Sequence, residues 1–377
     1  MDLYLSAALK LINVIKSNGF EAYIVGGYVR DYILNDNPHD IDITTSALPN
    51  DIMNMFKKVY PTGIDFEGVT VVYESYTFEV TTYRKDISYY DHRHPKVAYA
   101  STLAEDLSRR DFTINAMCLD SNMNVIDLFN GINDLNNKII RTVGEAEIRF
   151  YEDALRMLRA FYFSAKLGFK IEEDTLKGIE NNALYLDSIS GERIYAELKK
   201  MLNSKYSLNG LNYLSKSKLL NYLPSLKEAT ILLSNTNESV SFIEYLALGF
   251  YLEGFTERYK LSTRETKSIK SIITLIDLKF DNYTLFSYEY CDLKSANKLK
   301  QLLNKDYLIN FDDIYNSLPI KNKKDLDFDS NILINMGFKG KEIGETLEKL
   351  YRLVLDKKVL NTKDELIKAL LKEVKNG

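Results

Sequence analysis

The sequence predicts an α+β fold in which a mixed β-sheet with helices comes first and an all-helical region follows. In the first 140 or so of the 377 residues, helical and strand patterns alternate. From Glu145 onwards, apolar residues recur at helical spacing between short polar turns. The chain has only 17 glycines and 6 prolines, which favours long helices over an all-β architecture. The length suggests two or three domains.

The composition excludes several classes of protein. Hydrophobic residues make up 45% and charged residues 27%, which is typical of a folded globular chain and not of a disordered one. No apolar run approaches the ~18–20 residues that span a bilayer, so we expect no membrane contact. The N-terminus shows no secretion signal, and Cys118 and Cys291 are too few for a disulfide framework. We therefore expect a cytoplasmic protein.

The net charge is close to neutral, with 49 basic against 53 acidic residues. This balance argues against a protein coated in positive charge. It leaves nucleic acid open as a partner, because phosphate contacts depend on a local basic surface.

The predicted elements of the first region follow one another closely. Residues 2–18 have the amphipathic pattern of a helix, residues 20–25 predict a short strand, and residues 28–35 predict a second helix. Further strands are expected at residues 40–44, 70–73, 77–83, 113–119 and 125–127. Clear helical patterns then occur at residues 151–167, 191–202 and 341–355, and the polar stretch 321–329 is the best linker.

Gly26 and Gly27 lie between the first predicted strand and the second predicted helix, in IVGGYVRD. A strand that turns directly into a helix leaves backbone N–H groups free at the helix N-terminus, which is a site for phosphate. Arg30 could add a charge-assisted contact. The alternative interpretation is a tight turn in which the glycines only relieve steric strain.

Asp40 and Asp42 lie in the next predicted strand, HDIDI. Alternate side chains of a strand share a face, so we expect both carboxylates on one side, about 7 Å apart. Such ligands suit Mg²⁺, which takes one or two protein carboxylates together with substrate phosphates. The alternative is a solvated acidic strand face.

A phosphate site followed by a metal-binding strand is the layout that phosphoryl or nucleotidyl transfer requires. A third carboxylate normally completes a site for two metal ions. Glu79, flanked by apolar residues in TFEVTTYR, is the best candidate, and Glu74 and Glu67 are weaker ones.

Arg109 and Arg110 begin the sequence RRDFTINAM. We expect that they cannot both be structural on one face and that one faces a triphosphate, which needs several cations. The alternative is a pair of surface arginines. Asp111 and Asn115 could hold the turn or reach a ribose hydroxyl.

Asp153 and Arg156 are spaced i, i+3 in YEDALRMLRAF and are expected to be neighbours on one helix. The simpler interpretation is an ordinary intrahelical ion pair. In the alternative, the pair reads a nucleobase, because an Asp acceptor beside an Arg donor complements an amino group next to a ring nitrogen. Cytosine and adenine both present that edge, whereas uracil and guanine present the reverse.

Together these residues resemble the ordered motifs of the class II tRNA nucleotidyltransferases, or CCA-adding enzymes, of the tRNA nucleotidyltransferase/poly(A) polymerase family. The resemblance rests on GGYVRD with DID, RRDFTINAM, EDALRMLRA and ISGERIYAEL, across roughly residues 15–205, and returns weakly at 336–371. It implies a catalytic head (1–140), a neck with the base-reading helix (141–205), a helical body (206–321) and a helical tail (322–377).

By position, the resemblance implies roles for individual residues. Gly26, Gly27 and Arg30 resemble triphosphate contacts, and Asp40 and Asp42 resemble the ligands of two Mg²⁺ ions. Further nucleotide contacts would come from Arg110, Asp153, Arg156 and Arg159. One departure concerns the family pattern RAxRF, because this sequence reads RAFYF and has Tyr162 in place of the second arginine.

The implied function is addition or repair of the 3′-terminal CCA of tRNA from CTP and ATP, without a nucleic-acid template and with release of pyrophosphate. The tail would hold the tRNA elbow, and the neck and body the acceptor stem. The alternatives are an A-adding or CC-adding enzyme or a poly(A) polymerase. A catalytically silent tRNA-binding protein and transfer to a small molecule are more distant rivals.

Residues 83–100 bear on the choice between full CCA and CC addition. Their polar, aromatic and charged composition, with Pro95, predicts a mobile surface loop. In the resembled family, enzymes that add A need a flexible loop here, and it looks full length in this chain, with Asp91 and Arg93 in DHRHP.

Overall fold

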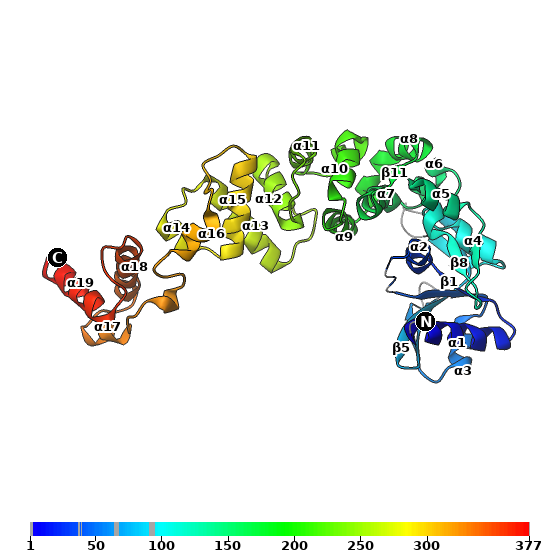
Figure 1. Ribbon diagram of the computed structural model, residues 1–377, viewed down its shortest axis with the longest axis horizontal. Coiled ribbons are helices and arrows are strands. Elements are labelled where there is room, and N and C mark those ends of the chain that lie inside the picture. Colours follow the sequence, from blue (N-terminus) through cyan, green and yellow to red (C-terminus); the bar gives the residue numbers. More distant parts are fainter. Residues whose placement is uncertain (1–2, 37, 39, 64–67, 90–94, 377) are drawn as a thin grey trace. The chain divides into compact units, whose positions relative to one another are not determined.

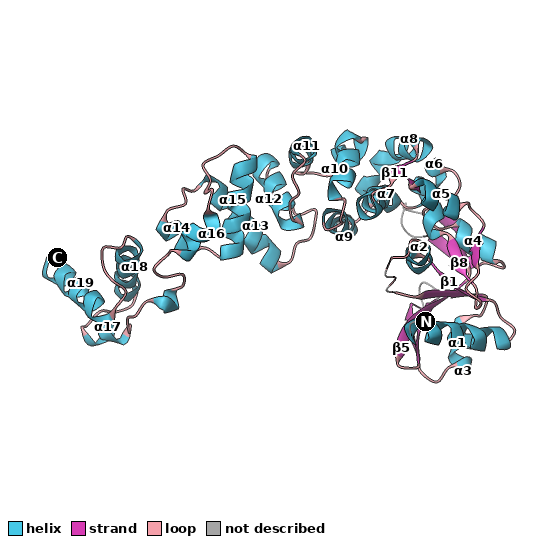
Figure 2. Cartoon of the chain, in the orientation of Figure 1, coloured by secondary structure: helices cyan, strands magenta, loops and turns pink. Residues whose placement is uncertain are grey.

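The structure is a computed structural model that describes residues 3–36, 38, 40–63, 68–89 and 95–376 (Figure 1). The chain divides into two compact units. The first unit comprises Met1–Ser239 and Thr256–Lys260, and the second comprises Val240–Phe255 and Leu261–Gly377. The predicted α+β class is confirmed, since all the described strands lie in the first unit and helices dominate the remainder (Figure 2).

A mixed sheet forms the core of the first 130 residues. The described strands run in the order β3-β4-β5-β2-β1-β8-β9. Their bounds are β1 Ala22–Val25, β2 Asp42–Thr45, β3 Val59–Gly63, β4 Gly68–Tyr73, β5 Tyr76–Thr82, β8 Met117–Leu119 and β9 Val125–Asp127. β2 and β5 are parallel, and the other described neighbours are antiparallel. The strand that begins with Asp42 therefore lies in the middle of the sheet.

Helices contact the sheet through apolar faces. α1 (Leu3–Ser17) buries Leu11, Ile12 and Ile15 completely and contacts β1 and β5, as the amphipathic pattern predicts. α2 (Gly27–Ile33) follows β1 directly and contacts β1 and β8. α3 (Pro49–Met55) contacts α1, β3 and β4. The predicted helix–strand–helix start is thus confirmed.

Two predicted strands are wrong in detail. β2 begins at Asp42, so Asp40 precedes the strand, two residues after Pro38. Residues 113–115 form a short 3₁₀ helix, η2 (Thr113–Asn115), and only β8 is a strand. Here the side chains of Thr113 and Asn115 take part in buried hydrogen bonds, which a strand pattern does not reveal.

One strand of the main sheet was missed, and one predicted loop is wrong. β3 contains Pro61, which argues against a strand, but β3 lies at the sheet edge, where proline is tolerated. Residues 83–100 were expected to form a loop, yet β6 (Arg84–Tyr89) and β7 (Pro95–Tyr99) pair as an antiparallel hairpin. The alternation in RKDISY suits that pairing. Asp91 and Arg93 lie outside the described residues.

The rest of the first unit is mainly helical. The elements are α4 Leu103–Ser108, α5 Gly131–Asn137, α6 Ala146–Glu152, α7 Leu155–Leu167, α8 Glu173–Asn182, η3 Ala183–Ser188, α9 Gly191–Leu202, α10 Ser207–Lys216, η4 Lys218–Tyr222 and α11 Lys227–Thr236, with β10 Ile139–Ile140 paired to β11 Lys170–Ile171. α7 packs against α9 and α10. Gly191, the first residue of α9, packs against the backbone of Arg258. A Cβ on residue 191 would lie 1.4 Å from the Arg258 carbonyl oxygen, so only glycine fits.

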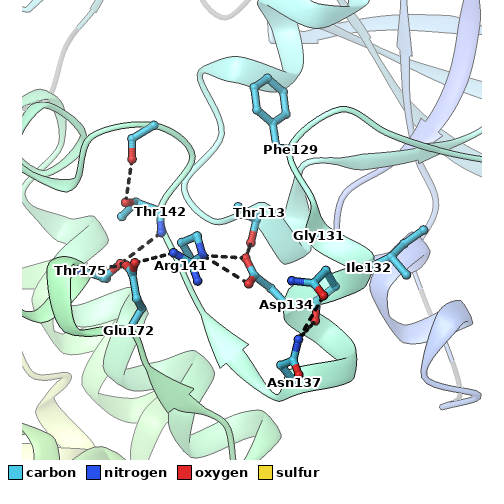
Figure 3. Close-up of polar contacts among 12 residues, drawn as sticks. Thr113, Phe129, Gly131, Ile132, Asp134, Asn137, Arg141, Thr142, Glu172 and Thr175 are labelled. Carbon is cyan, nitrogen blue, oxygen red and sulfur yellow. Dashed lines mark hydrogen bonds and ion pairs between the residues drawn. The ribbon is translucent and has the colours of Figure 1, made fainter.

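A polar network joins the sheet region to these helices (Figure 3). Arg141 donates to both carboxylate oxygens of Asp134, at 3.2 and 3.1 Å, and pairs with Glu172. Thr113 also donates to Asp134, at 2.7 Å, and the hydroxyl of Thr175 donates to Glu172 at 2.8 Å. The network therefore fixes η2, which carries Asn115, relative to the N-terminus of α8.

The second unit is helical throughout its described length. Its elements are α12 Phe242–Glu253, α13 Thr263–Asp277, α14 Asn282–Ser287, α15 Tyr290–Leu302, α16 Phe311–Asn316, η5 Lys323–Asp325, α17 Asn331–Asn335, α18 Lys341–Leu355 and α19 Lys363–Asn376. Ser241 and Ser262 begin α12 and α13 with capping boxes, which satisfy N–H groups at both helix starts. Among the described helices, none has the length and apolarity needed to cross a membrane.

Candidate active site

Most of the residues that the sequence singled out line one pocket of about 470 Å³ in the first unit. The lining comprises Gly26, Gly27, Arg30, Asp42, Arg109, Arg110, Asp111, Asn115, Asp153, Arg156, Arg159, Tyr162, Phe163 and Lys200. A larger cavity of about 570 Å³ adjoins the network of Figure 3. Four of its lining residues are acidic and two are basic, so it suits an anionic ligand less well.

The glycine turn allows charged side chains to approach the backbone. Gly26 has φ +77°, a conformation that favours glycine. A Cβ on Gly26 would lie 3.4 Å from Nη1 of Arg110 and 3.6 Å from Oδ2 of Asp42. The turn after β1 therefore places the Gly26 backbone, the Asp42 carboxylate and the Arg110 guanidinium side by side. The glycine thus does more than relieve steric strain in the turn.

Carboxylates gather at the start of β2. Asp42 pairs in register with Glu79 of the parallel strand β5, so the predicted third carboxylate lies beside it. Although the pocket admits solvent to Asp42, the pKa of this carboxyl is raised to about 6, mainly by reduced hydration and also by the negative charges of Glu79 and Asp40. Arg110 opposes that rise. Like charges are thus concentrated where a cation would stabilise them.

The donor set fits a metal ion that shares its ligands with a substrate. Within the described parts of the chain, no three acidic, imidazole or thiol side chains are placed to hold an ion on their own. Mg²⁺ commonly takes one or two carboxylates and completes its octahedral shell with water and phosphate oxygens. Asp42, with Asp40 and Glu79 near it, supplies hard oxygen donors of that kind.

Arg109 and Arg110 share a carboxylate that the sequence analysis did not single out. Asp106 of α4 is fully buried, with Nη2 of Arg109 at 2.9 Å and Nη2 of Arg110 at 3.6 Å. The expectation that both arginines cannot be structural on one face is therefore wrong. The i, i+3 and i, i+4 spacing in DLSRR was the signal that could have revealed Asp106. Arg110 still borders the pocket beside Gly26.

Arg30 and Arg159 both contact one aromatic ring. Each guanidinium lies 5.3 Å from the centre of the Phe163 ring. Arg30 is 3% exposed, forms two hydrogen bonds with Asp31 and donates to Asn115 at 2.7 Å. Buried ion pairs of this kind fix the positive charge instead of leaving it mobile.

Arg159 is anchored in the same way by Asp111. Its Nε and Nη2 atoms donate to one oxygen of Asp111, at 2.8 and 2.6 Å. Burial alone would raise the pKa of Asp111, but Arg159 and the hydrogen bonds that the carboxylate accepts hold it below the ordinary value. Asp111 therefore stays ionised and positions Arg159.

Asp153 and Arg156 line the pocket but do not form the expected intrahelical ion pair. Asp153 lies in extended backbone between α6 and α7, so the two residues are not on one helix. It accepts from the Leu155 N–H at 3.1 Å and from Arg193 of α9 at 2.8 Å. Arg156 pairs with Glu152 at 2.7 Å. Separate partners thus hold an acceptor, Asp153, and a donor, Arg156, and both residues line the pocket.

Known proteins match the chain along almost its whole length. The "Poly A polymerase head domain" model matches residues 22–141, "Probable RNA and SrmB- binding site of polymerase A" matches 168–230, and tRNA nucleotidyltransferase domain 2 matches 246–370. The CCA-adding enzyme of Lactobacillus helveticus is 36% identical, over 98% of this chain and 97% of that protein. That of Staphylococcus haemolyticus is 35% identical, over 98% of each.

The chain belongs to the tRNA nucleotidyltransferase/poly(A) polymerase family. A solved structure agrees with this assignment: the Bacillus stearothermophilus CCA-adding enzyme in complex with CTP has a TM-score of 0.84 and 33% identity, and the match covers 100% of both chains. Members of this family transfer nucleotides with the help of divalent metal ions, which agrees with the carboxylates around Asp42.

The structure adds three residues to those that the family resemblance implied: one lines the pocket, and two hold residues that line it. Asp106 holds the arginine pair, Arg193 holds Asp153, and Lys200 of α9 lines the pocket near Tyr162. Arg193 lies within the family motif ISGERIYAEL, but the sequence alone could not connect it to a carboxylate 40 residues earlier.

Proposed function

We propose that this chain is a CCA tRNA nucleotidyltransferase that adds or repairs the 3′-terminal CCA of tRNA from CTP and ATP, without a nucleic-acid template, and releases pyrophosphate. The observation that carries the proposal is a single pocket that joins the Gly26–Gly27 turn, Asp42 and the Asp153/Arg156 wall. Relatives that match nearly the full chain bear the name CCA-adding enzyme, which supports it.

In this proposal the pocket orients the nucleotide from both ends. The N–H groups of Gly26 and Gly27 bind the triphosphate, with positive charge from Arg30 and Arg110. Asp153 accepts from the exocyclic amino group of cytosine or adenine, and Arg156 donates to the adjacent ring nitrogen. Uracil and guanine would leave Asp153 and Arg156 without hydrogen bonds to the base. Polar groups left without partners in a pocket disfavour binding strongly, so UTP and GTP would be rejected. Arg159, anchored by Asp111, supports the same wall.

Asp40 and Asp42 would hold Mg²⁺, with two ions in the usual arrangement and Glu79 next to them. When bound, the ions lower the pKa of the attacking hydroxyl and stabilise the leaving pyrophosphate. Asp42 pairs with Val25, the residue before the Gly26 turn, so the 3′-hydroxyl of the tRNA would meet the α-phosphate at this end of the pocket. The primer then grows by one nucleotide, and pyrophosphate leaves.

The remaining chain would bind the RNA. We propose a head at 1–140, a neck at 141–205, a body at 206–321 and a tail at 322–377, with the tail at the tRNA elbow and the neck and body on the acceptor stem. Such binding uses shape and phosphates more than base identity. The second compact unit begins at Val240, within the proposed body. We propose that the reaction takes place in the cytoplasm.

The length of the products tests this proposal. The protein is incubated with tRNAs that end before C74, before C75 or before A76, and each labelled nucleotide is offered alone or with the others. We expect two C additions followed by one A, and no extension with UTP or GTP. Arrest after CC would establish a CC-adding enzyme, extension only of tRNA ending in CC an A-adding one, and long A tails a poly(A) polymerase. No product at all would contradict the proposal.

A further inference from the structure

Most cations at the pocket are already fixed by carboxylates. Each of the five arginines that line it has an acidic side chain within 4 Å: the pairs are Arg30–Asp31, Arg109–Asp106, Arg110–Asp106, Arg156–Glu152 and Arg159–Asp111. These arginine side chains are 3–30% exposed. Lys200, the sixth cation of the described lining, also pairs with a carboxylate, Glu197 at 2.9 Å, but its side chain is 52% exposed. Lys200 thus keeps the most freedom to reach a ligand.

The position of Lys200 follows from the packing of α7 and α9. Arg193 contacts Asp153, Glu197 lies 3.8 Å from Arg159, and Nζ of Lys200 lies 5.9 Å from the centre of the Tyr162 ring. The order of these contacts shows that α7 and α9 run in the same direction, so later residues of α9 contact later residues of α7. Lys200 is seven residues beyond Arg193, or about 10 Å along α9. It thus lies about two helical turns from the residue that holds Asp153.

That end of the pocket adjoins the glycine turn. The ring of Phe163, next to Tyr162, contacts the guanidinium groups of both Arg30 and Arg159. Arg30 belongs to α2, which starts at Gly27, where the triphosphate is proposed to bind. If the base lies against Asp153, the terminal phosphates extend towards Tyr162 and Lys200.

Glu197 allows Lys200 to move. This carboxylate is 4% exposed, and the same oxygen, Oε1, lies 2.9 Å from Lys200 and 3.8 Å from Arg159. The other oxygen, Oε2, is buried and has no hydrogen-bond partner among the described residues. When Lys200 turns towards a ligand, Arg159 remains as a second cation near Glu197. A lysine offers three donors on a flexible stem, which suits this movement.

We propose that Lys200 binds the β- or γ-phosphate of the incoming nucleoside triphosphate and supplies, from α9, the positive charge that Tyr162 does not supply from α7. This inference rests on the proposed function, because it adds a contact to the same nucleotide. The competing interpretations are a surface ion pair with Glu197 alone and a contact to the RNA backbone.

The test compares nucleotides with and without terminal phosphates. CTP and CMP are titrated into the full chain with Mg²⁺ by calorimetry, for the wild type, Lys200→Ala, Lys200→Arg and Lys199→Ala. Lys199 is the matched control, since it is the adjacent lysine, bonds to the Tyr195 hydroxyl and is not part of the pocket lining.

We expect Lys200→Ala to weaken CTP binding about tenfold, the usual effect of losing one charge-assisted hydrogen bond, and to leave CMP binding unchanged. Lys200→Arg should restore most of the affinity for CTP, and Lys199→Ala should behave as wild type. Equal CTP affinity in Lys200→Ala and wild type would overturn the inference, as would an equal loss for CMP. A wild-type chain that binds CTP but adds nothing to tRNA would instead refute the proposed function.

Discussion

Replacing Asp42 or Asp40 with alanine should abolish nucleotide addition while tRNA binding stays nearly intact. These carboxylates are proposed to hold the ions that stabilise charge in the transition state, and losing several kcal/mol of such stabilisation slows the reaction at least about a thousandfold. The measurement is single-turnover incorporation of CTP into tRNA lacking CCA. Near-normal incorporation by either variant would remove that residue from the mechanism.

Two controls separate this effect from misfolding. Glu74→Gln changes an exposed carboxylate that pairs with Lys10, and it should leave the rate unchanged.

Asp42→Asn should not destabilise the chain in the presence of a chelator. The pKa of Asp42 is raised from 3.8 to about 6 in the folded state, so its ionisation costs stability as the pH rises from about 4 to 6. Removing the charge should therefore raise the melting temperature at pH 8 and have little effect at pH 4.

Replacing Arg156 with alanine, or Asp153 with asparagine or alanine, should relax the selection of nucleotides. A good two-point base contact contributes about 1–3 kcal/mol of discrimination, so preference for CTP and ATP over UTP and GTP should fall by roughly ten- to a hundredfold. CTP and ATP should also be used more slowly. The measurement is kcat/KM for each of the four nucleotides with the same tRNA.

The asparagine variant of Asp153 is the sharper test. Its amide oxygen can still accept from the Leu155 N–H, so the start of α7 is kept, while the amide nitrogen presents a donor where the carboxylate presented an acceptor. Equal losses for all four nucleotides in both variants would show that the residues support the fold and do not read the base.

The features that the sequence predicted depend on local chemistry. Gly26 was recognised because a sharp strand-to-helix turn needs glycine, and Glu79 because an acid among apolar strand residues is unusual. Both lie beside Asp42 in the structure. Asp153 was misplaced on a helix because no proline or glycine marks the break before α7. The bonds that stabilise that break, above all the one from Arg193, come from a distant helix.

Lys200 was missed because its position in the pocket depends on contacts across the fold. Lys200 and Tyr162 are 38 positions apart, and only the packing of α7 on α9 brings them together.

Arg30 looked like an open phosphate contact, but Asp31 and Asn115 hold it almost fully buried. Periodicity predicts which face a helix buries, but it cannot specify which helix covers that face.

The central claim is that one pocket serves both nucleotides, so the most direct measurement is a competition between them. Labelled CTP is bound to the wild-type chain with Mg²⁺, and unlabelled ATP is titrated in. We expect one nucleotide per chain, full displacement of CTP by ATP, and a loss of affinity for both in Arg156→Ala. Simultaneous binding of CTP and ATP, or binding of both that is unaffected by Arg156→Ala, would contradict the account.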